Sequence, residues 1–196
     1  GMVGSPSLNK DTISVASVEN VKLTMPYMEA KIGEEGPINI GYNHAGDSPN
    51  PVEVFKDKEV EVVYVGTGEP QYYEGKDVSG KIVLAVRTGS YYYGNIKATA
   101  QEKGAAGVLV RGAEAHGDYV NMNIGDPPHT IPMASLSQAN GNMLKEKLEA
   151  GNTVKVSFGG EKDQFPNSDG GKISTFSSWG TTPTLDMKPE ITAPGG

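Results

Sequence analysis

The stretch Gly80-Lys81-Ile82-Val83-Leu84-Ala85-Val86 begins the segment that decides the fold of this chain. Its apolar run predicts a strand that is covered on both faces. Residues 94–104 then change to helical spacing, and Gly104 stands where a helix commonly ends. A second apolar run follows at Val108–Val110. The order strand, helix, strand predicts a right-handed βαβ unit whose two strands are parallel.

Further strands and one more helix are predicted on either side of this unit. In Val60–Val65 the alternation places Val63 and Val65 on one face and Val60, Val62 and Tyr64 on the other. Ser137 is a good N-cap for a second helix, and Gly151 follows its end. The sequence therefore predicts an α/β (α+β) fold, a small mixed sheet or open β-barrel with helices near 94–104 and 138–150. The additional strands are expected at 12–18, 22–25, 131–136 and 153–158.

Composition excludes several classes of function. The chain has 196 residues, a net charge of -7 and no cysteine, so disulfides, thiolate metal sites and a cysteine nucleophile are excluded. An acidic chain is a poor partner for nucleic acid or an anionic membrane surface. No apolar run is long enough to cross a bilayer. We therefore expect no nucleic-acid partner and no membrane span.

Two histidines could support an autonomous activity. His116 stands between Glu114 and Asp118 and could serve as a metal ligand or acid-base group. His129 follows two prolines and precedes Thr130. A small hydrolase or metal site that uses His116 or His129 is the alternative hypothesis, whereas solvated loop or turn residues are the preferred interpretation.

Other polar motifs predict no chemistry. Gly66-Thr67-Gly68 follows a strand but lacks the spacing and the helix of a dinucleotide site, so a loop is preferred. Ser178 lacks the setting of a nucleophile elbow. Asp47, Asp57 and Asp77 are too scattered to define a calcium loop. We expect no catalytic residue, no metal site and no cofactor in this chain, although the sequence leaves calcium binding open.

Tyr91, Tyr92 and Tyr93 are consecutive and precede the first predicted helix. Three consecutive rings cannot all enter one core, so at least one should be exposed or half-exposed. Packing across a domain boundary is one interpretation. The other is a contact surface for a polypeptide, because tyrosine offers a large rigid area with a polar tip.

The central pattern resembles the protease-associated domain. The resemblance rests on Gly80–Leu84 and its helix, on the segment Gly104-Ala105-Ala106-Gly107-Val108-Leu109-Val110, and on Ile131-Pro132-Met133 with the helix and strand that follow. It covers roughly residues 55–158.

The two ends of the chain resemble pieces of subtilisin-family serine proteases. Phe176-Ser177-Ser178-Trp179-Gly180 with Met187–Gly195 is similar to the segment that leads toward the catalytic serine. Gly4-Ser5-Pro6 with Ile13-Ser14-Val15-Ala16-Ser17-Val18 is similar to the strand after the oxyanion-hole asparagine. About 150 residues separate Asn20 from Lys172, and their periodic strands predict a folded insertion rather than a loose loop.

These resemblances imply a domain organisation and a function. Residues 1–20 would be a remnant strand of a subtilase catalytic domain, residues 21–160 the protease-associated domain, and residues 161–196 a linker and a second remnant. The family's Asp, His and Ser motifs would all lie outside this chain. The fragment would thus be a non-catalytic module of a secreted or cell-wall-associated endopeptidase. It would contact polypeptide substrates and its own catalytic domain, with Tyr91, Tyr92 and Tyr93 as the contact surface.

Overall fold

The computed structural model describes residues 15–18, 21–168, 180–181, 187–188 and 191–194. The chain divides into two compact units, Met25–Asp163 and a unit formed by Gly1–Thr24 with Gln164–Gly196. The predicted nucleophile-approach motif at 176–179, including Ser178, lies outside the described residues. No helix in the described ranges is long and apolar enough to cross a membrane.

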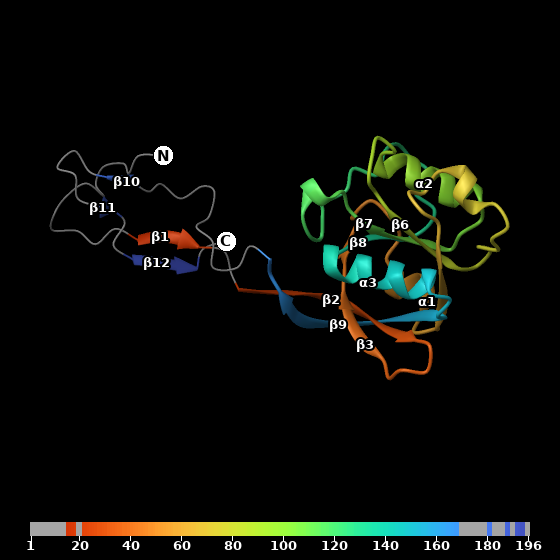
Figure 1. The fold of residues 1–196 in the computed structure, drawn as a ribbon, viewed down its shortest axis with the longest axis horizontal. Coiled ribbons are helices and arrows are strands. Elements are labelled where there is room, and N and C mark those ends of the chain that lie inside the picture. Colours follow the sequence, from red (N-terminus) through yellow and green to blue (C-terminus); the bar gives the residue numbers. More distant parts are fainter. Residues whose placement is uncertain (1–14, 19–20, 169–179, 182–186, 189–190, 195–196) are drawn as a thin grey trace. The chain divides into compact units, whose positions relative to one another are not determined.

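The elements follow one another in an irregular alternation of strands and helices (Figure 1). The first half comprises β1 (Val15–Val18), β2 (Lys22–Ile32), β3 (Ile38–Gly41), β4 (Asn43–His44), α1 (Pro51–Phe55), β5 (Val60–Tyr64), the 3-10 helix η1 (Pro70–Tyr73) and β6 (Ile82–Val86). The second half comprises α2 (Tyr93–Glu102), β7 (Gly107–Arg111), the 3-10 helix η2 (Glu114–His116), β8 (Met133–Leu136), α3 (Gln138–Glu149), β9 (Val154–Pro166), β10 (Gly180–Thr181), β11 (Met187–Lys188) and β12 (Ile191–Pro194).

An eight-stranded mixed sheet forms the centre of the unit Met25–Asp163, in the order β3-β2-β9-β5-β6-β7-β8-β4. The pairs β5–β6, β6–β7 and β7–β8 are parallel, whereas the pairs β2–β3, β4–β8 and β5–β9 are antiparallel. The predicted pairing of β6 with β7 is confirmed, with Ile82 opposite Gly107 and Val86 opposite Arg111. The βαβ unit is therefore the parallel middle of the sheet.

Hydrophobic clusters cover both faces of this parallel middle. Ile82 and Leu84 of β6 pack into one cluster with Leu144 of α3. Val83 of the same strand packs into the other cluster with Ile96 of α2. Helices α2 and α3 thus lie on opposite faces (Figure 1). The predicted alternation of β5 is confirmed, because its residues divide between the same two clusters.

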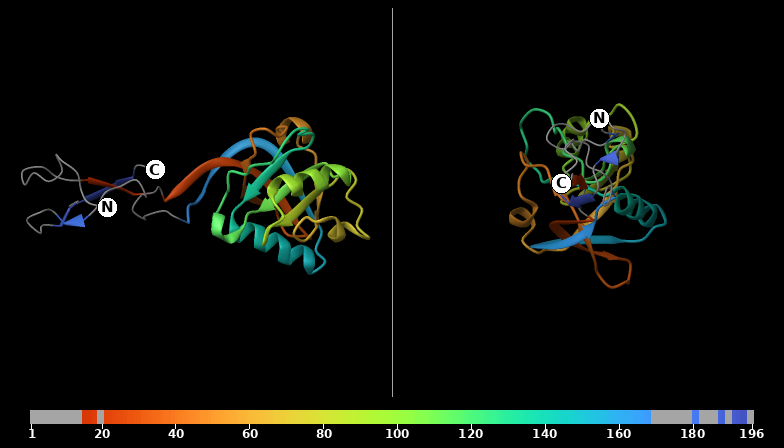
Figure 2. Two further views of the ribbon diagram at one scale, coloured as in Figure 1. Left: turned by 90° about the horizontal axis from the view of Figure 1, so that it is seen from above. Right: turned by 90° about the vertical axis from the view of Figure 1, so that its left-hand side faces the viewer.

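The two edge strands of the sheet are consecutive in the chain. Only Tyr42 separates β3, at one edge, from β4, at the other. The Tyr42 side chain is buried, and its backbone N–H donates to the carbonyl of Pro26. The long strands β2 and β9 curve side by side, as two views show (Figure 2). The sheet consequently curls into an open barrel, which confirms the predicted fold class.

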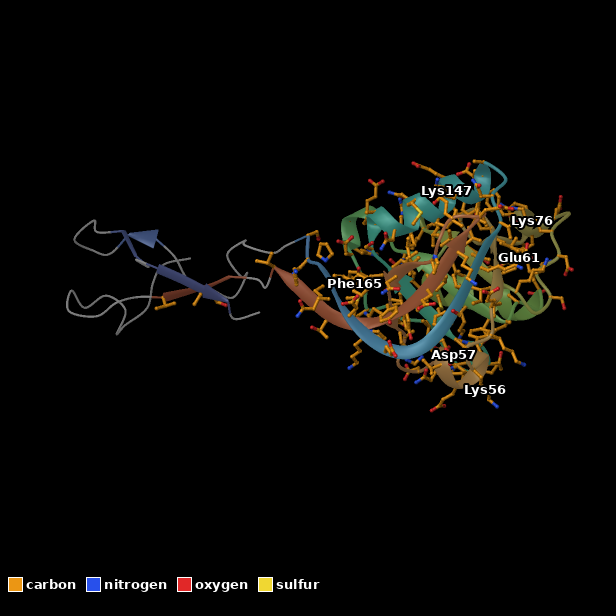
Figure 3. All side chains as sticks on the ribbon, turned by 90° about the horizontal axis from the view of Figure 1, so that it is seen from below. Lys56, Asp57, Glu61, Lys76, Lys147 and Phe165 are labelled. Carbon is orange, nitrogen blue, oxygen red and sulfur yellow. The ribbon has the colours of Figure 1, made fainter. Side chains whose placement is uncertain are left out.

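Helix α1 and the outer part of β9 differ from the sequence prediction. Residues 51–55 form a helix that the sequence analysis did not predict, and its N-cap Asn50 accepts a hydrogen bond from the N–H of Val52. Lys56 and Asp57, with φ of 49° and 62°, end this helix (Figure 3). Residues 161–166 were expected to be linker but continue β9. Their side chains are mostly exposed, so the strand lacks the apolar alternation that would reveal it.

The second unit contains two small strand pairs. Strand β1 pairs with β12 in parallel, with Val15 opposite Ile191 and Val18 opposite Pro194. Strand β10 pairs with β11 in antiparallel orientation. Residues from opposite ends of the sequence therefore share one small sheet.

Candidate functional site

The three consecutive tyrosines lie between the end of β6 and the first turn of α2, and their environments differ. Tyr91 is half-buried, and its hydroxyl lies 2.5 Å from the Oγ1 atom of Thr99. Tyr93 is 5% exposed, whereas Tyr92 is 61% exposed. Of the three rings, only Tyr92 therefore offers most of its surface to another molecule.

Arg87 lies against two of these rings. It directly follows β6, and its guanidinium carbon is 4.3 Å from the centroid of the Tyr93 ring and 5.2 Å from that of Tyr92. Its Nε donates a long hydrogen bond of 3.4 Å to the carbonyl of Gly89. The guanidinium is thus held by cation–π contacts with both rings.

The Tyr93 hydroxyl connects α2 to the loop after β7. It accepts a hydrogen bond of 3.2 Å from the backbone N–H of Ala113 and lies 2.6 Å from Nδ1 of His116. Because the ring of Tyr93 also supports Arg87, the end of β6 and the loop after β7 are joined through one side chain.

The side chain of Asn43 in β4 and the backbone of Gln138 in α3 fix that loop. Asn43 donates from Nδ2 to the carbonyl of Tyr119 and to Oδ1 of Asn121, both at 2.9 Å. Gln138 donates from its backbone N–H to Oδ1 of Asp118 at 2.7 Å. The loop therefore has a defined position although it is long and polar.

Two adjoining hollows lie beside Arg87 and share it with Tyr93 and Asn123. The smaller hollow, about 270 Å³, extends along Tyr92 and the first turn of α2. The larger one, about 590 Å³, extends along the loop that contains His116. Both lie beyond the carboxyl ends of β6 and β7, which is where ligands bind in many sheets with parallel strands.

The candidate histidines have different partners. His116 contacts Tyr93 of the hollow, whereas His129 accepts at Nδ1 a hydrogen bond of 2.8 Å from Nζ of Lys97. Lys97 is 2% exposed and also donates to the carbonyl of Asp126 at 2.7 Å. Burial lowers the pKa of Lys97, and the charge of Asp126 opposes that shift. His129 thus helps to tie the loop 126–130 to α2.

The other polar candidates are dispersed. Gly66-Thr67-Gly68 forms a turn that leads into η1, in agreement with the preferred loop interpretation. Within the described ranges, no three His, Cys, Asp or Glu side chains lie close enough to hold a metal ion. The hollows beside Arg87 therefore form the candidate site.

Comparison with known proteins agrees with this fold. Residues 58–144 match the PA domain family. These residues form a PA domain. The match spans β5 to the middle of α3 and includes Arg87 and the three tyrosines.

Several proteases contain a region similar to this PA domain and its flanks. The chain is 32% identical over 197 residues to the minor extracellular protease Vpr of Bacillus subtilis, covering 98% of this chain and 22% of that protein. It is 31% identical to a C5a peptidase of Streptococcus pyogenes, covering 100% of this chain and 15% of that protein. It thus matches the PA-domain region of subtilases and spans less than a quarter of these relatives.

Solved structures share the fold. An aminopeptidase from Aneurinibacillus sp. strain AM-1 superposes with a TM-score of 0.53 at 22% identity, over 79% of this chain and 42% of that chain. A zinc aminopeptidase from Bacillus subtilis gives a TM-score of 0.51 at 19% identity, over 76% of this chain and 35% of that one. At this identity the likeness concerns the PA fold alone.

Neither Arg87 nor Asn123 was predicted from the sequence to be a site residue. The signal for Arg87 was present, because a single cation directly follows the apolar run of β6. The contact of Tyr93 with His116 could not be read from the sequence, since it depends on the loop that follows β7.

Proposed function

We propose that this chain is the non-catalytic PA-domain region of a secreted or cell-wall-associated subtilisin-like serine endopeptidase, in which it controls which polypeptides reach the catalytic cleft. Residues 21–160 are the PA domain in this proposal, and residues 1–20 and 161–196 are flanking pieces of the catalytic domain. The extracellular protease among the relatives supports a location outside the cell.

The parallel pairing of β1 with β12 carries the proposal. Residues 15–18 and 191–194 come from opposite ends of the sequence, yet they hydrogen-bond in register. Parallel strands need a crossover connection, and here the PA domain occupies that connection. This arrangement is what an insertion between two strands of a host sheet requires.

Tyr92 is the contact residue that the geometry favours among the three tyrosines. Its ring is 61% exposed, whereas Tyr91 and Tyr93 use their hydroxyls inside the domain. An exposed tyrosine beside a hollow offers a rigid apolar area with a polar tip, a combination that is enriched in protein contacts. We therefore assign substrate contact to Tyr92 and a supporting role to its two neighbours.

Substitution of Tyr92 by serine in the full-length protease tests this function. We expect kcat/KM for protein substrates to change by up to about thirty-fold, the scale of about 2 kcal/mol for a hot-spot ring. A short chromogenic peptide should be cleaved at an unchanged rate. Tyr72→Ser is the matched control, because Tyr72 is 43% exposed but lies on η1, away from the lining of both hollows. Equal effects of the two variants would contradict the proposal.

The chain itself allows a direct test of the rival hydrolase hypothesis. We expect the purified chain neither to react with a fluorophosphonate probe nor to digest casein. Labelling or cleavage that His116→Ala or His129→Ala abolishes would establish an autonomous activity in place of the proposed role.

A further inference from the structure

Arg87 has no carboxylate partner among the residues that the structure describes. The sequence contains two arginines and 24 acidic residues. Arg111 donates from Nη1 to Asn142 and from Nη2 to the carbonyl of Arg87, both at 3.0 Å. By contrast, no described residue accepts a hydrogen bond from the terminal nitrogens of Arg87, and no described ion pair includes it. These donors of Arg87 are available to a ligand.

The two hollows beside Arg87 differ in charge. Among the described residues that line the smaller hollow, Arg87 is the sole charged one, and its neighbours there are tyrosine, asparagine and glycine. The larger hollow also contains the carboxylate of Asp118. An acidic ligand group therefore meets an uncompensated positive charge in the smaller hollow, whereas in the larger one the charge of Arg87 is accompanied by that of Asp118.

We propose that Arg87 binds the side chain of an internal Asp or Glu of an extended polypeptide, with the carboxylate in the smaller hollow. This inference rests on the proposed function and names the substrate feature that the same surface selects. The planar guanidinium presents paired donors that match a carboxylate, and the tyrosine rings keep it oriented. The polypeptide can continue on both sides of Arg87 because the hollows adjoin there, so an internal residue suits the geometry better than a chain end.

Nuclear magnetic resonance titration of this chain tests the assignment. The probes are a short blocked peptide with one central glutamate, its glutamine counterpart, and the glutamine peptide with a free C-terminal carboxylate. We expect the glutamate peptide to shift the resonances of Arg87 Nε–H, Gly94 and the Asn123 side chain. The glutamine peptide should bind about tenfold more weakly, as expected when a hydrogen bond to a charged group is lost.

Variants of Arg87 and one control variant make the test specific. Arg87→Gln should abolish the preference for glutamate, whereas Arg87→Lys should retain part of it because the charge remains but the paired donors are lost. Lys76→Gln is the matched control, since Lys76 also lies over a tyrosine, with its Nζ 5.8 Å from the centroid of the Tyr64 ring. This control should keep the full preference. Unchanged spectra for residues outside the site would show that each variant is folded.

Three results would overturn the inference: equal binding of the glutamate and glutamine peptides, a preference that persists in Arg87→Gln, or shifts that map away from Arg87. Tighter binding of the peptide with the free C-terminal carboxylate would replace the internal side chain by a chain end and would also overturn it. The peptide titration does not involve the protease reaction. A failure of Tyr92→Ser to alter proteolysis would therefore refute the proposed function, but the preference for the glutamate peptide in the titration could still be measured and interpreted.

Discussion

Replacing Gly141 by alanine tests how tightly α3 packs on the end of β7. A Cβ atom at this position would lie 2.5 Å from both Cβ and Cγ of Arg111 and 3.4 Å from its Cα. Carbon atoms in contact are ordinarily about 3.5–4.0 Å apart. Arg111 is 4% exposed, and the atoms concerned are at the root of its side chain. The clash can therefore be relieved only if the helix or the strand moves.

Two opposing effects set the magnitude. Alanine is the better helix former in a helix interior, which favours the variant by about 1 kcal/mol. Overpacking a tight contact costs about 1–3 kcal/mol and occasionally more. Because the added Cβ would lie 2.5 Å from two atoms of Arg111, we expect an overpacking cost in the upper part of that range. The free energy of unfolding should fall by about 1–2 kcal/mol, which lowers the Tm of a domain of this size by about 2–8 °C.

Urea and thermal unfolding of Gly141→Ala measure the effect, with Gly46→Ala as the control. At Gly46 an added Cβ has no atom within 4 Å and the backbone needs no positive φ, so the control should be neutral or slightly stabilised. The displacement should also reach the site, because Nη2 of Arg111 donates to the carbonyl of Arg87. A Gly141→Ala protein as stable as the control would refute the packing argument.

Three further substitutions test buried polar groups. Burial lowers the pKa of Lys97 in the folded chain. Between that pKa and about 10.4, the unfolded chain therefore binds more protons than the folded one. The free energy of unfolding should rise with pH across this range. Urea unfolding of Lys97→Met at successive pH values should lack that part of the rise, and a rise equal to that of the wild type would contradict the assignment. The Tyr73 hydroxyl is buried and has no partner among the described residues, so Tyr73→Phe should be neutral or more stable by up to about 1 kcal/mol. A loss of stability in urea unfolding would argue against that. Tyr93→Phe removes the hydroxyl that accepts from the N–H of Ala113 and contacts Nδ1 of His116. The free energy of unfolding should fall by about 1–2 kcal/mol. Hydrogen exchange at the Ala113 amide that stays as slow as in the wild type would rule out this role.

The parts of the fold that were predictable are those in which the pattern is local. Strand β6 is buried on both faces, as its continuous apolar run predicted. Ser137 was predicted to cap α3, and its side chain accepts a hydrogen bond from the N–H of Asn140. The faces of β5 followed from simple alternation. In each case the environment of a residue is determined by its own neighbours in sequence.

The parts that were missed depend on distant partners or on weak local signals. The outer half of β9 is polar because its side chains are exposed, and only its pairing with β2 makes it a strand. The short helix α1 was marked by Asn50 and Pro51, an N-cap followed by a favoured first residue, but it has only 5 residues. The sequence predicted that at least one of the three tyrosine rings is exposed but could not decide which one, since that depends on Thr99 and on the loop after β7.

The position of β9 within the sheet has a consequence for synthesis on the ribosome. It is the last strand of the sheet in sequence, yet it lies between β2 and β5. While the chain is being made, β5 to β8 with α2 and α3 can assemble as they emerge, because their pairings are between successive elements. The earliest strands, β2 and β3, can pair with each other, but they join β5 only after residues 154–166 have left the exit tunnel. Cotranslational folding of this domain is thus completed by its final segment.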